Sequence, residues 1–116
     1  MNNDRVVVVT GGASGMGLGI CKRFAELGHP VAMLDVQEAA LQAESSALAA
    51  GGARIYAAKV DVADRQQVED AYAAIRKQLG PISIIIANAG ISKAVDFLTM
   101  PIATWQQMID VNLTGV

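Results

Sequence analysis

The residues that most clearly indicate a binding function are the glycines of Thr-Gly-Gly-Ala-Ser-Gly-Met-Gly, residues 10–17, which follow the apolar run Val6–Val9. This order predicts a strand that ends in a glycine-rich turn, and a helix that begins at the turn. Gly11 allows a tight exit from the strand, Gly15 lets backbone N–H groups approach a pyrophosphate, and Gly17 lets the helix pack closely on the sheet. Because the segment lies in a strand-helix-strand unit, it predicts a phosphate-binding turn rather than an ordinary tight turn.

The start of the helix adds to this predicted site. Ser14 and Met16, which flank Gly15, belong to the same binding turn. The helix N-terminus carries about half a positive charge, which favours a bound phosphate. The segment thus indicates a nucleotide cofactor.

Asp35 ends a second predicted strand, 20 residues after Gly15. Its carboxylate is placed to accept hydrogen bonds from the ribose hydroxyls of an adenosine and to repel a 2′-phosphate. Two unit charges about 4 Å apart interact by about 4 kcal/mol at an effective dielectric constant of about 20. Since neither Ser14 nor Val36 supplies a cation beside the ribose, the sequence favours NAD over NADP. The alternative is a strand-terminal aspartate that only forms a turn.

The elements that would position these residues alternate between strand and helix. Short apolar runs predict four strands, at Arg5–Thr10, Val31–Asp35, Arg54–Val60 and Ile82–Ala87. Helical spacing predicts helices at Gly15–Leu27, at Glu38–Ala50, from Asp64 to Leu79, and from Pro101 onward. Right-handed crossovers then give a parallel sheet of order 3-2-1-4. The fold class is therefore α/β, a Rossmann-type doubly wound parallel sheet that this sequence holds in truncated form.

Three local features of these elements make checkable predictions. Asp64 is the predicted N-cap of its helix, with Gln67 as the reciprocal partner of a capping box. The strand Ile82–Ala87 is apolar without alternation, which is typical of a central strand covered on both faces. Trp105, at helical spacing, is predicted to be a packing residue.

The ordered motifs resemble those of the short-chain dehydrogenase/reductase (SDR) family. Five elements of that family occur in sequence over nearly the whole chain: TGxxxGxG at Thr10, Gly11, Gly15 and Gly17, the acidic Asp35, Asp61-Val62, Asn88-Ala89-Gly90, and Val111-Asn112-Leu113-Thr114-Gly115. One departure is Ala87, where many members have a further asparagine.

The resemblance implies roles for residues beyond the glycine turn. Asp61 and Val62 would meet the adenine ring, although a helix-entry cap is the alternative for Asp61. Asn88, Ala89 and Gly90 would lie at the carboxyl end of a central strand, where ligands bind in open α/β sheets, and their alternative is a plain turn.

The segment that includes Val111 would also face the cofactor. Within it, Asn112 resembles the family's catalytic asparagine, whose main-chain carbonyl holds a water of the proton relay. Without the resemblance, an asparagine in a helical pattern indicates a local bend or a polar surface residue.

The resemblance implies an NAD(P)-dependent oxidoreductase that transfers a hydride between a nicotinamide cofactor and a small alcohol or ketone. The family's catalytic serine and its Tyr-x-x-x-Lys pair do not occur in this sequence, since Tyr56 is followed four residues later by Val60, and Tyr72 by Arg76. Residues 1–116 are therefore expected to be the N-terminal dinucleotide-binding part of one Rossmann domain, and to be inactive alone. The alternatives are a non-catalytic nucleotide-binding module and an inactive fragment.

Composition excludes several other classes of protein. The net charge is −2, aromatic residues make up 4% of the chain, and no basic run occurs, which argues against nucleic acid as a partner. The apolar runs are far shorter than the ~20 residues of a membrane span, and no signal peptide is evident. The lone Cys21 cannot form an internal disulfide and lies on an apolar stripe, so the sequence predicts a core residue and a cytoplasmic protein. No metal site is predicted, and a homo-oligomer is an expectation from the resemblance.

Overall fold

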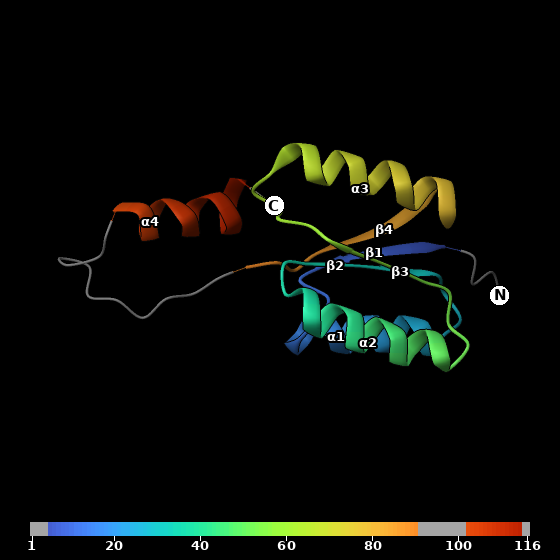
Figure 1. The fold of residues 1–116 in the computed structure, drawn as a ribbon. Coiled ribbons are helices and arrows are strands. Elements are labelled where there is room, and N and C mark those ends of the chain that lie inside the picture. The colour runs from blue at the N-terminus through green and yellow to red at the C-terminus, as the bar shows by residue number, and fades with distance from the viewer. Residues whose placement is uncertain (1–4, 91–101, 115–116) are drawn as a thin grey trace.

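The computed structural model describes residues 5–90 and 102–114. Four parallel strands form one sheet in the order β3-β2-β1-β4, as the sequence predicts. The strands are β1 (Val6–Thr10), β2 (Val31–Asp35), β3 (Ile55–Lys59) and β4 (Ile82–Ala87). The chain therefore has the α/β, Rossmann-type architecture, with β1 and β2 at the centre of the sheet (Figure 1).

Helices cover the two faces of the sheet. On one face lie α1 (Gly15–Glu26) and α2 (Glu38–Ala50), and on the other lies α3 (Arg65–Gln78) (Figure 1). This arrangement follows from right-handed crossovers, which place consecutive helices according to the order of the strands they connect. All five residues of β1 and of β2 are buried between the two layers.

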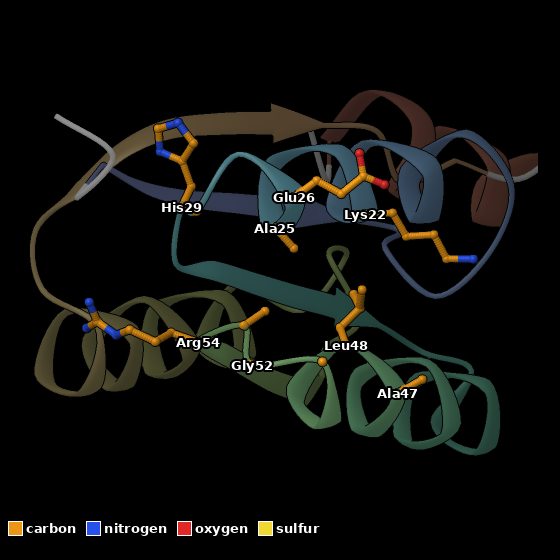
Figure 2. A pocket seen from close by; sticks show the side chains of 11 residues that line it. Lys22, Ala25, Glu26, His29, Ala47, Leu48, Gly52 and Arg54 are labelled. Atoms are coloured by element: carbon orange, nitrogen blue, oxygen red, sulfur yellow. The ribbon is translucent and has the colours of Figure 1, made fainter. Parts of the chain in front are cut away.

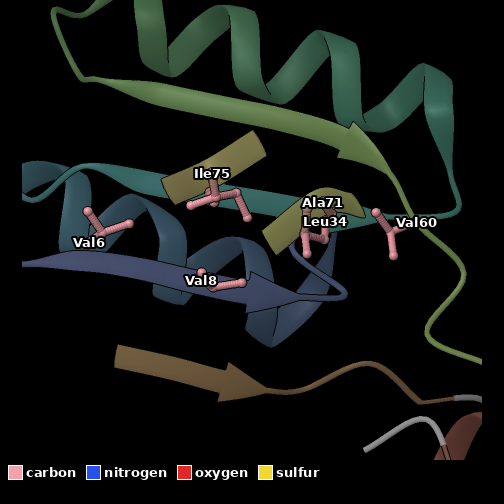
Figure 3. Packing of buried hydrophobic residues seen from close by; sticks show 7 residues of the cluster. Val6, Val8, Leu34, Val60, Ala71 and Ile75 are labelled. Carbon is pink, nitrogen blue, oxygen red and sulfur yellow. The ribbon is translucent and has the colours of Figure 1, made fainter. Parts of the chain in front are cut away.

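The alternating side chains of the central strands divide the core into two clusters. Val7, Val9 and Met33 face α1 and α2, where they pack with Cys21 and Leu41. The opposite cluster packs under α3 and consists of Val6, Val8, Ala32, Leu34, Val60, Ala71 and Ile75 (Figure 3). Both faces of the central strands are thus apolar, as a parallel sheet requires.

The fourth strand differs from its sequence prediction. Its residues alternate between half-buried and exposed, and the side chain of Ile85 is 52% exposed. Ile84 and Ile86 pack on the α1 and α2 cluster, whereas no helix of the described residues covers Ile85. The prediction of a strand covered on both faces is therefore wrong for the described part of the chain. The reason is that, among the described residues, β4 pairs only with β1, and α3 lies over the centre of the sheet.

Helix α3 begins with a side-chain N-cap, which departs in one respect from the predicted capping box. The Asp64 side chain accepts hydrogen bonds from the backbone N–H groups of Gln66 and Gln67, which confirms the cap. The Oε1 atom of Gln67, however, accepts the N–H of Asp61 at 2.9 Å, its Nε2 donates to the Asp64 carboxylate at 3.0 Å, and the N–H of Asp64 bonds to the Asp61 carbonyl instead. The cap therefore also fixes the loop between β3 and α3.

The last described helix, α4 (Ile102–Ile109), continues as a π-helical segment, η1 (Asp110–Thr114). No residue of α4 is buried, and Trp105 is 50% exposed, so its predicted packing role is not found in this structure. Wider π turns are rare and often lie at functional sites. Two residues with sequence predictions, Pro101 and Gly115, lie outside the described residues.

Candidate functional site

The parallel strands place their carboxyl ends, and the turns that follow them, along one edge of the sheet. A cleft of about 220 Å³ opens at this edge. Eight of the thirteen predicted site residues line it: Gly11, Ser14, Asp35, Asp61, Val62, Ala89, Gly90 and Val111. Segments from five places in the sequence therefore meet at one site.

Four further residues line the same cleft, which the motifs of the sequence did not include. Val36 and Gln37 follow Asp35 directly, and Val60 precedes Asp61, so adjacency alone could have indicated them. Gln107 lies four residues before Val111, which is the spacing of neighbours on one helix face. Among the described residues that line the cleft, none is basic.

Hydrogen bonds hold the turn after β1 against the turn after β4. The Thr10 hydroxyl accepts the N–H groups of Asn88 and Ala89, each at 3.1 Å. The Asn88 side-chain amide in turn donates to the Gly11 carbonyl at 3.2 Å. Asn88 thus supports the site by positioning Gly11, and Thr10, which the sequence showed only as part of a motif, joins the two turns.

The three motif glycines meet different surroundings. A Cβ on Gly17 would overlap the Gly11 carbonyl, so only glycine lets α1 approach β1 this closely. Gly11 and Gly15 adopt left-handed backbone angles, with φ of +67° and +57°. A Cβ on Gly15 would meet no atom within 4 Å, because it would enter the open space beside the turn. Gly15 therefore borders open space, whereas Gly17 allows close packing of α1 on β1.

The N-terminus of α1 is open toward this space. Ser14 is the N-cap, and its side chain makes no capping hydrogen bond. Ser14, Gly15 and Met16 are all exposed, Met16 to 77%. Backbone N–H groups at a helix N-terminus without a side-chain acceptor suit an anionic ligand, so the residues present fit the phosphates of a dinucleotide.

Asp35 lies almost completely buried, at 7% exposure, at the end of β2. Its Oδ1 accepts the N–H of Gln37 and its Oδ2 accepts the N–H of Ala13, both at 3.0 Å. The bond to Gln37 closes a turn at the end of the strand, as expected if Asp35 has the alternative role of a turn-forming aspartate. Each oxygen keeps a second lone pair, so the same carboxylate can also accept from a ligand hydroxyl.

Asp61 and Val62 are half-buried on the neighbouring loop. The Oδ1 atom of Asp61 accepts the N–H of Ala63 at 2.9 Å, which forms a local turn. The helix-entry cap, which was the alternative for Asp61, is instead supplied by Asp64. Asp61 therefore lies at the wall of the cleft without serving as the cap.

Asn112 lies on η1 and is exposed. A Cβ on Gly90 would stand 3.3 Å from the Asn112 Oδ1 atom, so the two residues face each other across the end of β4. Val111, its neighbour, lines the cleft. The π-helical segment thus carries the candidate catalytic asparagine to the same edge as the glycine turn.

A larger cleft, of about 490 Å³, lies between the C-terminal ends of α1 and α2 (Figure 2). It is at the opposite edge of the sheet, because these helix ends lead into the starts of β2 and β3. Its polar side chains Lys22, His29 and Arg54 point in different directions rather than toward a common centre (Figure 2). This cleft therefore lacks the converging polar groups of a built ligand site.

Other candidate chemistries find no support among the described residues. Burial raises the pKa of the Cys21 thiol to about 12, so the thiol stays protonated and is a core residue, not a nucleophile. Within residues 5–90 and 102–114, no cluster of side chains could hold a metal ion. No helix in the same ranges has the length and apolar character needed to cross a membrane.

The chain is similar to known oxidoreductases in sequence and in structure. It is 40% identical over 109 residues to galactitol 2-dehydrogenase (L-tagatose-forming) of Cereibacter sphaeroides, covering 93% of this chain and 41% of that protein. It is 37% identical over 113 residues to 1-deoxy-11-beta-hydroxypentalenate dehydrogenase of Streptomyces arenae, covering 96% of this chain and 40% of that protein. The chain thus spans about two fifths of the length of these relatives.

The fold of the chain is also similar to that of a solved structure. A short chain dehydrogenase/reductase from Burkholderia phymatum, in complex with NAD, matches with a TM-score of 0.93 and 28% identity, over 99% of this chain and 42% of that chain. The family model described as short chain dehydrogenase matches residues 5–116. With its sheet order, its glycine turn and this match over almost all of its length, the chain belongs to the short chain dehydrogenase family.

Proposed function

We propose that this chain is the cofactor-binding part of an NAD-dependent oxidoreductase that acts on a small alcohol or ketone. The observation that carries the choice of cofactor is the cleft at the carboxyl edge of the sheet. Two carboxylates, those of Asp35 and Asp61, line it, and none of its lining residues in the described part of the chain is basic. A 2′-phosphate would be repelled there, whereas ribose hydroxyls would find acceptors.

The residues divide into groups by the part of the cofactor they would hold. The N-terminus of α1, with Gly15 and Met16, would hold the pyrophosphate, because its N–H groups have no capping side chain. Asp35 would hold the adenosine ribose, and Asp61 with Val62 the adenine. When bound, the nicotinamide supplies the hydride acceptor or donor.

The remaining predicted residues would serve the other half of the cofactor. Ala89, Gly90 and Val111 are small or apolar and line the cleft beside β4, so they leave room for a second ribose. The main-chain carbonyl of Asn112 would hold a water that passes a proton to or from the substrate. Residues 1–116 would then form the N-terminal dinucleotide-binding part of a single Rossmann domain.

Calorimetric titration of the full-length protein with NADH and with NADPH tests this function. NADH should bind at least about tenfold more tightly, since even a third of the ~4 kcal/mol between two charges in contact corresponds to a factor of ten. Replacement of Asp35 by alanine together with Val36→Arg should move the ratio of the two affinities toward NADPH. Equal or tighter binding of NADPH by the unaltered protein would overturn the preference.

The alternative of a nucleotide-binding module without turnover is tested separately. Residues 1–116 expressed alone should show no dehydrogenase activity, because a positioned proton donor typically contributes 10²–10⁴-fold and the sequence lacks the Tyr-x-x-x-Lys pair. The full-length protein should oxidise or reduce an alcohol or ketone. Cofactor binding without turnover over a panel of such substrates would favour the module.

A further inference from the structure

The glycine turn is attached to the neighbouring strand by a side chain as well as by its backbone. The N–H of Gly12 donates to the Leu34 carbonyl at 3.2 Å, just beyond the last paired residues of β1 and β2, Thr10 and Leu34. The next N–H, that of Ala13, has left the strand and donates to Oδ2 of Asp35 at 3.0 Å. Ala13 is 2% exposed and Asp35 is 7% exposed, so this bond is shielded from water.

The same carboxylate is itself held in place. Its other oxygen, Oδ1, accepts the N–H of Gln37 at 3.0 Å, so the side chain is fixed by a turn at the end of its own strand. A hydrogen bond from N–H to a buried carboxylate is about twice as strong as one between neutral groups. Without an acceptor at this position, the buried N–H of Ala13 would be left unsatisfied. Asp35 is therefore a rigid acceptor for the turn.

We propose that Asp35 is a positioning residue of the glycine turn, in addition to any contact with a ribose. In the absence of ligand, its carboxylate holds Ala13 and thereby fixes the entry to α1, two residues before Gly15. The turn then keeps the form that receives phosphate, so less ordering is left to the moment of binding. The consequence for cofactor affinity rests on the proposed function, whereas the attachment of the turn does not.

Amide hydrogen exchange of the ligand-free, full-length protein, read residue by residue by NMR, tests the attachment. In Asp35→Ala, exchange at Ala13 should accelerate on the order of tenfold or more, the factor expected for a lost bond to a buried charge. Exchange at Met33, in the buried middle of β2, serves as the reference for global unfolding. Asp61→Ala is the matched control, because its carboxylate lines the same cleft but bonds to Ala63.

A conservative variant separates positioning from general destabilisation. Asp35→Asn keeps the shape but only one acceptor oxygen, so one of the two N–H groups, that of Ala13 or that of Gln37, should keep its slow exchange. If Asp35→Ala does not fold, this variant decides the question by the same ratio to Met33. Exchange at both amides equal to that of the unaltered protein, within a factor of two relative to Met33, would overturn the proposal.

The two proposals fail in different ways. Loosening of the turn weakens NADH and NADPH alike, so it leaves the ratio of their affinities unchanged. Contact with the ribose changes that ratio and leaves the exchange of the ligand-free protein unchanged. A shifted ratio with unchanged exchange would reject positioning only, and accelerated exchange with an unchanged ratio would reject the cofactor preference only.

Discussion

The two sides of the carboxyl edge are built differently. On the β1–β2 side, both strands are fully buried, and Asp35 and the helix packing at Gly17 hold the glycine turn in place. On the β4 side, residues of the strand alternate between half-buried and exposed, α4 has no buried residue, and Asn112 is exposed. In the described part of the chain, the β1–β2 side is therefore tightly packed and the β4 side is more exposed to solvent.

This difference matches the division of the proposed chemistry. In the proposed function, backbone N–H groups hold the phosphates, and the carboxylates of Asp35 and Asp61 hold the adenosine, so the segments after β1, β2 and β3 supply these groups. A hydride transfer needs groups that converge on a substrate from several elements. Under the proposed function, cofactor recognition and substrate chemistry would thus draw on different parts of this edge.

Disturbing the packing of α1 on β1 should have the largest effect on stability. Gly17→Ala should lower the free energy of unfolding by about 3 kcal/mol, because its Cβ would overlap the backbone at Gly11. Urea denaturation of the full-length protein measures it. Gly19→Ala is the matched control in the same helix, since its Cβ would meet nothing within 4 Å and should be neutral or stabilising by up to about 1 kcal/mol. Equal effects of both changes would contradict close packing at Gly17.

A change in the turn itself should act on binding more than on folding. Gly15→Val should abolish NADH binding, because the side chain would enter the space proposed for the pyrophosphate, while its left-handed backbone costs about 1–2 kcal/mol of stability. Calorimetry and circular dichroism report the two effects separately. Gly52→Val, also left-handed and open but distant from the cleft, should cost stability and leave NADH binding intact. Unchanged NADH affinity in folded Gly15→Val would show that this turn does not hold the phosphates.

The Thr10 hydroxyl is one of the links between the turns after β1 and β4. Thr10→Val should lower the free energy of unfolding by about 2 kcal/mol, because the N–H of Ala89 loses its acceptor and the N–H of Asn88 keeps only its bond to the Ile86 carbonyl. Thermal unfolding measures this. Ser45→Ala is a control of similar burial, whose hydroxyl makes one bond within α2, so it should cost less than about 1 kcal/mol. A smaller loss in Thr10→Val than in Ser45→Ala would mean that the two turns hold together without this hydroxyl.

Replacing either of two nearby aspartates on the loop before α3 should have smaller effects, and the two effects should differ in kind. Asp64→Ala should cost about 1 kcal/mol of stability as a lost cap and leave NADH affinity unchanged. Asp61→Ala should instead weaken NADH binding, because only Asp61 of the two lines the cleft. Weaker NADH binding in Asp64→Ala alone would reverse the roles of the two aspartates.

Arg65→Ala, which removes an exposed ion pair with Glu69, should change the free energy of unfolding by less than about 0.5 kcal/mol.

Much of the fold could be predicted from neighbours in sequence. The order of strands, the boundaries of α2 and the cap at Asp64 follow from hydrophobic spacing and from residues within a few positions of one another. The exposure of Ile85 and Trp105 could not be predicted in this way, because it depends on which elements cover them. An apolar residue indicates that burial is favourable, but it does not say what will bury it.

The sequence by itself determined the alternation of strands and helices, the glycine turn after the first strand, and the acidic residue at the end of the second. These features depend on local backbone preference and on hydrophobic period. Only the tertiary structure decided that Asp35 accepts the N–H of Ala13, 22 residues away, and that Asn112 lies beside Gly90. Such contacts between distant residues depend on how strands pair and helices pack, and no residue spacing in the sequence specifies the distance between them.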